Sequence, residues 1–127
     1  MPRWVLDSSA VLGMLRHEAG CGVVRELLPE AALSTVNVAE CLAWMTRQGL
    51  PAAAAWAAMQ DLHLMFAPFD EGQAQYSGVL AEQSLGAGLS LGDRACLALA
   101  HAFEVPAVTA DRAWARLRLG VEVRLIR

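Results

Sequence analysis

The chain has 127 residues, a hydrophobic fraction of 56% and a formal net charge of -3. This length suits one compact domain and is short for two, so we expect a single domain over residues 1–127. No apolar run approaches the ~20 residues that a transmembrane helix requires. The mildly acidic balance also argues against a protein that coats nucleic acid nonspecifically.

Cysteine usage and the first residues together indicate a cytoplasmic protein. Cys21, Cys41 and Cys96 are odd in number and form no CxxC pair, so we expect buried thiols rather than disulfides. The three histidines stand at no zinc-ligand spacing from these cysteines. The N-terminal segment leads directly into a strand-like run and lacks the order of segments that a secretion signal has.

Charge is distributed unevenly along the chain. All ten basic residues are arginines; up to Asp111 five arginines accompany twelve acids, a net charge of -7. After Asp111, five arginines accompany Glu122 alone, a net charge of +4. An arginine cluster beside an acidic centre can hold a phosphodiester, but a solvated arginine-rich tail explains the same pattern. Both interpretations remain open.

The first elements are indicated by a short apolar run and the residues that follow it. Residues 4–6 are apolar and end at Asp7, which is typical of a short strand. Ser8 and Ser9 then offer helix caps before the apolar residues 11–15. We therefore expect a strand, a turn and a helix.

The rest of the chain continues to alternate between helices and strands. In chain order, we expect a helix over residues 22–28, a strand over 31–33, a helix over 36–47, a helix over 52–62, a strand over 64–68, a helix over 71–85, a helix over 91–103, a strand over 106–109, a short helix near Trp114 and a strand over 121–126. Strands separated by helices predict an α/β fold, with a mainly parallel sheet of about five strands covered by helices on both faces.

Two aspartates follow strands directly. Asp7 and Asp111 each stand just past the carboxyl end of an expected strand, where open α/β sheets place their ligand crevice. If the two strands are neighbours, both carboxylates face one crevice, and two anions placed together need a cation. The alternative is that each aspartate only caps a turn or a helix, which is the commoner role for a single aspartate.

Glu40 and Asp93 are ambiguous from the residues alone. Glu40 shares a helical stripe with Asn37 and Arg47, which an ordinary solvated helix face also explains. Asp93 stands three residues after Ser90, the spacing of a capping box that satisfies a helix N-terminus. Periodicity and spacing leave both interpretations open.

The segments around these four acids resemble the motifs of the PIN-domain family, in the family's order. The segments are Val5-Leu6-Asp7-Ser8-Ser9-Ala10, Ser34-Thr35-Val36-Asn37-Val38-Ala39-Glu40, Leu89-Ser90-Leu91-Gly92-Asp93 and Val108-Thr109-Ala110-Asp111-Arg112-Ala113-Trp114. The similarity spans nearly the whole chain. A chain with little beyond this domain resembles the VapC-type toxins of VapBC toxin–antitoxin systems, which implies a PIN-like three-layer α/β/α fold.

The resemblance also implies a metal site and a reaction. It implies that Mg²⁺ or Mn²⁺ is held by four catalytic carboxylates, namely Asp7, Glu40, Asp93 and Asp111, with Ser8 and Thr109 supporting the site. Oxygen ligands alone suit these hard cations. The implied reaction is metal-dependent hydrolysis of RNA phosphodiester bonds by an endoribonuclease. Arg112 and Arg116 are candidates for contact with substrate phosphates.

The same resemblance implies two protein partners, a VapB-like antitoxin that covers the acidic crevice and a second toxin copy in a homodimer. Apolar residues on the middle helices could supply the surface for either contact, namely Trp44, Met45, Trp56 and Met59. We expect exposed apolar patches there, although such residues more often belong to the core.

Rival functions are less well supported. Aspartyl-phosphate chemistry, as in haloacid-dehalogenase phosphatases and response-regulator receivers, begins with a similar layout but normally needs a lysine, and this chain has none. Ser9 also stands where the phosphatases carry a second aspartate. Neither GxxxxGK[ST] nor GxGxxG occurs, which argues against the common nucleotide-binding loops. A catalytically inactive PIN-like module that binds RNA or protein is the remaining alternative, and the presence of all four acids argues against it.

Overall fold

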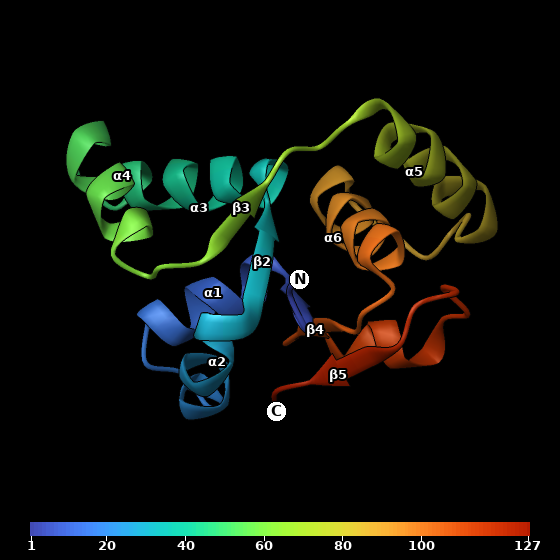
Figure 1. Ribbon diagram of the computed structural model, residues 1–127, viewed down its shortest axis with the longest axis horizontal. Helices are drawn as coiled ribbons and strands as arrows, with labels where there is room; N and C mark the ends of the chain where they lie inside the picture. Colours follow the sequence, from blue (N-terminus) through green and yellow to red (C-terminus); the bar gives the residue numbers. More distant parts are fainter.

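A five-stranded parallel sheet forms the centre of the computed structural model, which describes residues 1–127 (Figure 1). The strands are β1 (Trp4–Leu6), β2 (Ala31–Ser34), β3 (Met65–Ala67), β4 (Ala107–Thr109) and β5 (Val123–Leu125). Their spatial order is β3-β2-β1-β4-β5, and every neighbouring pair is parallel. The expected α/β class and mainly parallel sheet are confirmed.

Six α-helices and two 3₁₀ helices connect the strands. They are α1 (Ser8–Leu15), α2 (Cys21–Leu27), η1 (Leu28–Glu30), α3 (Thr35–Arg47), α4 (Ala52–Gln60), α5 (Glu71–Gln83), α6 (Leu91–Phe103) and η2 (Arg112–Arg116). Each expected element is present, and most differences are of one or two residues at the ends. The last strand is shorter than the expected 121–126, because its partner β4 offers only three residues for pairing.

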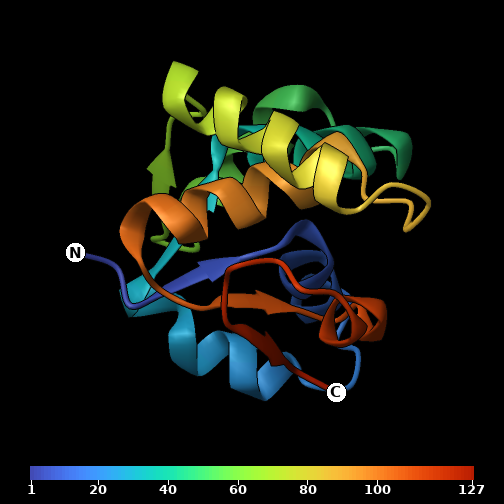
Figure 2. The ribbon, with the colours of Figure 1, turned by 90° about the vertical axis from the view of Figure 1, so that its right-hand side faces the viewer.

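Alternating side chains along the strands build a core on each face of the sheet, as the period of two requires. Leu6, Leu33 and Val108 join the core that α1 to α4 cover. Val5 and Ala32 join the core beneath α6 and η2. Figure 2 shows α6 on one side of β1 and β4 and α2 on the other, with α5 outside α6. The architecture is therefore three-layered.

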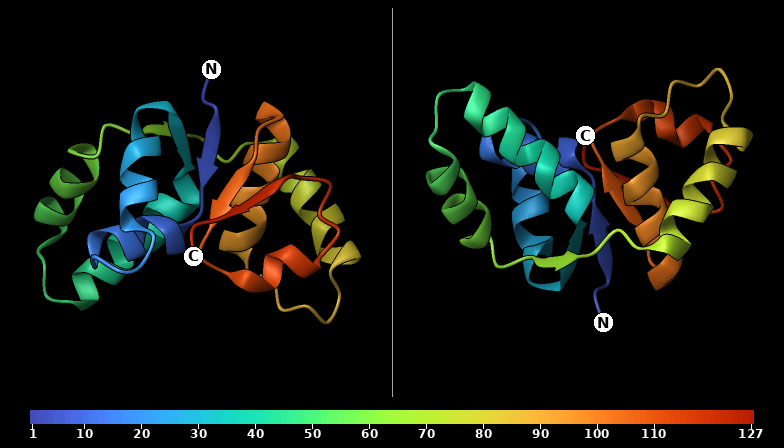
Figure 3. Two further views of the ribbon diagram at one scale, coloured as in Figure 1. Left: turned by 90° about the horizontal axis from the view of Figure 1, so that it is seen from below. Right: turned by 90° about the horizontal axis from the view of Figure 1, so that it is seen from above.

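The strand order creates a switch point between β1 and β4. The chain leaves β1 through α1 and α2 towards β2, whereas β4 pairs with the opposite side of β1 and continues towards β5. The arrows of β1 and β4 lie side by side and point the same way (Figure 3). Connections that diverge from neighbouring strands leave a crevice beyond their carboxyl ends, where ligands bind in this fold class.

The three cysteines are free thiols. Cys41 and Cys96 are buried and Cys21 is half-buried. Burial, with a smaller contribution from the nearby charge of Glu40, raises the pKa of the Cys41 thiol to about 12. Burial likewise raises the pKa of Cys96 well above its ordinary value. Both buried thiols are therefore neutral core groups. No helix is both long enough and apolar enough to span a membrane.

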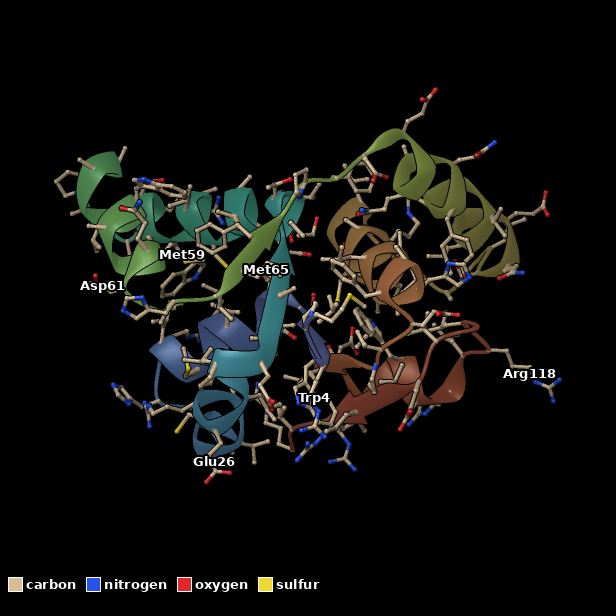
Figure 4. The ribbon with its side chains drawn as sticks, in the orientation of Figure 1. Trp4, Glu26, Met59, Asp61, Met65 and Arg118 are labelled. Atoms are coloured by element: carbon tan, nitrogen blue, oxygen red, sulfur yellow. The ribbon has the colours of Figure 1, made fainter.

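The middle helices expose less apolar surface than expected. Met45 and Met59 are buried, so the expectation of exposure is wrong for them; both belong to the core that α3 and α4 close over the sheet, and Figure 4 labels Met59 between α4 and β3. Trp44 is half-buried. Trp56 is 42% exposed, with its ring centroid 5.6 Å from that of Phe66. The exposed aromatic surface of these helices is therefore centred on Trp56.

Candidate active site

Two of the candidate acids, Asp7 and Asp111, follow the two strands that pair at the switch point. Asp7 follows β1 directly, and Asp111 follows β4 after one residue. The two strands pair in parallel with Leu6 opposite Val108, and the Asp7 backbone N–H donates to the Val108 carbonyl at 2.9 Å. Asp7 is buried, whereas Asp111 is exposed. β1 and β4 are therefore neighbouring strands, which is the condition for the carboxylates of Asp7 and Asp111 to face one crevice.

Asp7 is a buried carboxylate held by two hydroxyls. Ser9 Oγ and Thr109 Oγ1 donate to its Oδ2 atom at 2.6 Å and 2.9 Å. Burial raises the pKa of Asp7 to about 6; the two hydrogen bonds oppose this shift, and the charge of Asp93 adds to it. The Thr109 hydroxyl also accepts from the Asp111 backbone N–H at 3.0 Å. Thr109 thus links the two aspartates.

Glu40 is held from a different pair of elements. Ser8 Oγ on α1 donates to Glu40 Oε1 at 2.6 Å, and Asn37 Nδ2, one turn earlier on α3, donates to the same oxygen at 2.9 Å. Asn37 is completely buried, so the interpretation of its stripe as a solvated face is wrong for this residue. The stripe instead turns Asn37 and Glu40 towards α1 and α6.

Glu40 packs against Gly92, the residue before Asp93. A Cβ atom at Gly92 would occupy the space of the Glu40 carboxylate, so only glycine permits this approach between α3 and α6. Asp93, the next residue, forms the expected capping box: its Oδ2 accepts from the Ser90 N–H at 2.9 Å, and Ser90 Oγ accepts from the Asp93 N–H at 3.1 Å. The capping interpretation therefore holds, and Asp93 directly follows the glycine against which Glu40 packs.

Electrostatics link Asp93 to the other acids. Burial raises the pKa of Asp93, its hydrogen bonds with Ser90 oppose the shift, and the charges of Asp111 and Glu40 raise it further. Since like charges near one another disfavour ionisation, Asp93 responds to the charges of Asp111 and Glu40, and Asp7 responds to that of Asp93. Asp111 also caps η2, because its Oδ1 accepts from the Ala113 N–H at 2.9 Å. Local capping and a shared site are compatible.

Ser8 and Ser9 do not cap α1 as expected. The N-cap residue is Asp7, and its side chain makes no capping hydrogen bond. The serine hydroxyls bond instead to Glu40 and Asp7, because a carboxylate is a stronger acceptor than the alternatives along the helix. Sequence reasoning assigned Ser9 only a capping role and missed the roles of Asn37 and Gly92. The available signals were their positions in the sequence: Ser9 stands two residues after Asp7, Asn37 three residues before Glu40, and Gly92 one residue before Asp93.

The acids do not form a closed cage in this structure. No group of three or more His, Cys, Asp or Glu side chains lies close enough together to hold a metal ion. Hydrogen bonds nevertheless hold two of the acids at the carboxyl ends of the strands: Ser9 and Thr109 hold Asp7, and Ser8 and Asn37 hold Glu40. What the structure brings together is an open set of carboxylates around the switch point.

The candidate arginines lie beside this edge. Arg112 and Arg116 begin and end η2, are exposed, and take part in none of the chain's ion pairs, which involve Arg3, Arg16 and Arg127. Arg118, further along, projects away from the ribbon (Figure 4).

One surface cavity lies away from the candidate acids. Its volume is about 400 Å³, and it lies at the carboxyl end of α6, lined among others by His101, Glu104 and Glu122. None of the four candidate acids lines it. The chemistry of the site therefore rests on the crevice between β1 and β4 and not on this cavity.

Comparisons with known proteins agree with this architecture. The PIN domain family model matches residues 4–119. A search of curated proteins found no match for the sequence.

Several solved structures share the fold. DNA-bound VapBC from Salmonella typhimurium aligns with a TM-score of 0.79 at 15% identity, covering 100% of both chains. A toxin–antitoxin complex from Klebsiella pneumoniae aligns at 0.76 with 15% identity over 97% of each chain. VapBC-5 from Mycobacterium tuberculosis aligns at 0.65 with 22% identity over 99% of each chain. At these identities the likeness concerns the fold.

Proposed function

The chain belongs to the PIN domain family, and on that premise we propose that it is a metal-dependent endoribonuclease acting as the toxin of a type II toxin–antitoxin system. The observation that carries the proposal is the arrangement of four acids from four separate segments around one sheet edge. Asp7 and Asp111 come from neighbouring strands, and Glu40 packs against Gly92, the residue before Asp93. The catalytic set is Asp7, Glu40, Asp93 and Asp111.

The residues present fit Mg²⁺ or Mn²⁺ by their chemistry. Every candidate ligand is an oxygen, which these cations prefer. The carboxylate of Asp7 is buried beside the charge of Asp93, and burying like charges together is unfavourable unless a cation offsets them. Because no three acids are close enough to hold an ion as they stand, binding requires their side chains to move together. Asp111 is exposed and Asp93 half-buried, so neither is locked in a core.

The protein's own groups would act by holding and orienting. Ser9 and Thr109 fix the Oδ2 atom of Asp7, and Ser8 fixes Oε1 of Glu40. A bound divalent cation supplies Lewis acidity and an activated water for hydrolysis. Arg112, directly after Asp111, and Arg116, at the end of η2, are exposed and free of ion pairs, and would hold the phosphates of single-stranded RNA.

The toxin role and the partners are supported by the fold and its likeness to toxin–antitoxin complexes. The match to chains of VapBC complexes extends over 96% or more of this chain. We propose a VapB-like antitoxin that covers the acidic crevice, and a toxin homodimer. Trp56, exposed on α4, is the aromatic residue available on the middle helices for such a contact.

The deciding experiment is RNA cleavage by the purified chain with Mg²⁺ or Mn²⁺. We expect cleavage of a mixed RNA pool that is abolished by EDTA, restored by either cation, and lost in Asp7→Asn. Loss of cleavage in an Asp7→Asn variant that is no less stable to heat than the parent would separate catalysis from folding. RNA binding without any cleavage under all of these conditions would instead support a catalytically inactive binding module.

A further inference from the structure

Asn37 joins three elements through one buried amide. Its Nδ2 atom lies 2.9 Å from Glu40 Oε1, 3.0 Å from Ser8 Oγ and 3.0 Å from the Gly92 carbonyl oxygen. These acceptors belong to α3, α1 and α6 respectively. The side chain is completely buried. An amide nitrogen with two protons and three close acceptors directs all its donor capacity towards the Glu40 side of the site.

The other end of the same amide has no partner. Asn37 Oδ1 is buried and receives no hydrogen bond. Burying an unsatisfied polar atom costs free energy, and an apolar side chain of similar shape would avoid that cost. Stability alone therefore does not account for asparagine at this position, whereas its contact with a candidate metal ligand does.

Glu40 depends on this contact because the residue itself is exposed. An exposed glutamate on a helix ordinarily samples several rotamers. Here Ser8 and Asn37 donate to the same oxygen, and Gly92 leaves space for the carboxylate against α6. The three residues therefore restrict where the Glu40 carboxylate lies.

We propose that Asn37 is a positioning residue, which fixes the Glu40 carboxylate at the crevice before a cation binds. It acts through Glu40 and Ser8 and touches neither substrate nor cation. This inference rests on the proposed function, because it assumes that Glu40 is one of the cation's ligands. Its consequence is that removing the Asn37 amide weakens cation binding more than it weakens the fold.

A matched control exists elsewhere in the chain. Gln73 on α5 is also a buried amide, its Oε1 also lacks a donor, and its Nε2 donates to the Pro68 carbonyl at 3.2 Å. None of its hydrogen bonds involves Asp7, Glu40, Asp93 or Asp111. Gln73→Met therefore removes a comparable buried amide without touching the site.

The test compares Mn²⁺ binding to the full chain by electron paramagnetic resonance, alongside thermal unfolding without metal. For Asn37→Leu we expect Mn²⁺ affinity to fall by about tenfold or more, the usual effect of removing a group that orients a metal ligand. For Gln73→Met we expect Mn²⁺ affinity within about twofold of the parent. A change of about twofold is also the largest that a purely global effect on the protein should produce. If Asn37→Leu does not fold, Asn37→Ser takes its place. Serine keeps a hydrogen-bond donor with shorter reach, so we expect an intermediate loss of Mn²⁺ affinity.

A double variant distinguishes positioning from general loosening. Because Asn37 and Ser8 hold the same oxygen, Ser8→Ala combined with Asn37→Leu should weaken Mn²⁺ binding by less than the product of the two single effects. Parent protein that binds Mn²⁺, with Asn37→Leu binding it equally well, would overturn the positioning role and leave the proposed function standing. Parent protein that neither binds Mn²⁺ nor cleaves RNA would overturn both.

Discussion

Thr109 Oγ1 donates a 2.9 Å hydrogen bond to Asp7 Oδ2, joining residues that are 102 positions apart in sequence. The same hydroxyl accepts from the Asp111 backbone N–H at 3.0 Å. Thr109 is completely buried, so water cannot replace either hydrogen bond without rearrangement. One hydroxyl therefore both favours the ionised form of Asp7 and fixes the start of the turn that carries Asp111.

Replacing Thr109 by valine should move the pH dependence of activity. The bond from Thr109 lowers the pKa of Asp7, so its removal should raise that pKa further above about 6. If Asp7 acts as a carboxylate ligand, the acidic limb of the pH–rate profile should shift to higher pH, with activity at neutral pH reduced and partly regained in mild base. Thr109→Ser keeps the hydroxyl and should keep the parent profile; an unshifted profile in Thr109→Val would contradict this role.

The buried charge of Asp7 should also set the stability of the metal-free protein. The pKa of Asp7 is raised from 3.8 to about 6. Near pH 3 the carboxyl is protonated in both folded and unfolded chains, so its burial costs no ionisation free energy. As pH rises from about 3 to about 7 the unfolded chain ionises first, and stability falls by about 3 kcal/mol before levelling off. Urea unfolding in EDTA across this range measures the effect.

Asp7→Asn isolates that contribution from the titration of other groups. Without metal, the variant should be more stable than the parent at pH 7, by up to about 3 kcal/mol, and equal to it near pH 3. Saturating Mn²⁺ should raise the stability of the parent and leave the variant nearly unchanged. A variant that is less stable than the parent at pH 7 in EDTA would show that burial of this charge is not a cost.

Much of the fold could be predicted from local pattern because its elements carry their own signals. The apolar run before Asp7, the capping box of Ser90 and Asp93, and the alanine-rich helix over residues 52–60 are each encoded within a few positions. The order of strands and helices then restricts the topology to a few parallel arrangements. The sequence placed Asp7 and Asp111 just past two strand ends, whereas the adjacency of β1 and β4 came from the structure.

The residues that support the acids could not be predicted in the same way. The role of Asn37 depends on Gly92 lying 55 positions away, and the role of Ser8 depends on Glu40 lying 32 positions away. Such hydrogen bonds are fixed by how α1, α3 and α6 pack, and periodicity within one helix carries no information about its neighbours. Met45 and Met59 show the same limit, because pattern alone did not tell core from surface.

Arg112 and Arg116 should contribute to RNA binding more than to the chemical step. Both are exposed and free of ion pairs, so reversing their charge leaves no buried partner unsatisfied. Arg112→Glu and Arg116→Glu should each raise KM with little change in kcat, and each should lower the slope of RNA affinity against salt by about one released ion. Arg25→Glu, exposed on α2, is the control for net charge. Equal KM values in all three variants would remove the two arginines from the substrate path.

A substitution at Gly92 should change RNA cleavage without a comparable change in the free energy of unfolding. Alanine is favoured over glycine inside a helix by roughly 0.5–1 kcal/mol. At Gly92, however, the added methyl group would take the space of the Glu40 carboxylate, which lies at the end of a flexible and exposed side chain and can swing outwards. Gly92→Ala should therefore keep the free energy of unfolding within about 1 kcal/mol of the parent while abolishing most RNA cleavage.

Gly78, on α5, supplies the control because a Cβ atom there meets no other group within 4 Å. Gly78→Ala should gain the helical stabilisation of roughly 0.5–1 kcal/mol and retain full activity. Comparing the two alanine variants separates the effect of a methyl group in a helix from the displacement of one carboxylate. Full activity in Gly92→Ala would mean that Glu40 need not lie against α6, and the acid arrangement proposed for this crevice would then lose one of its four members.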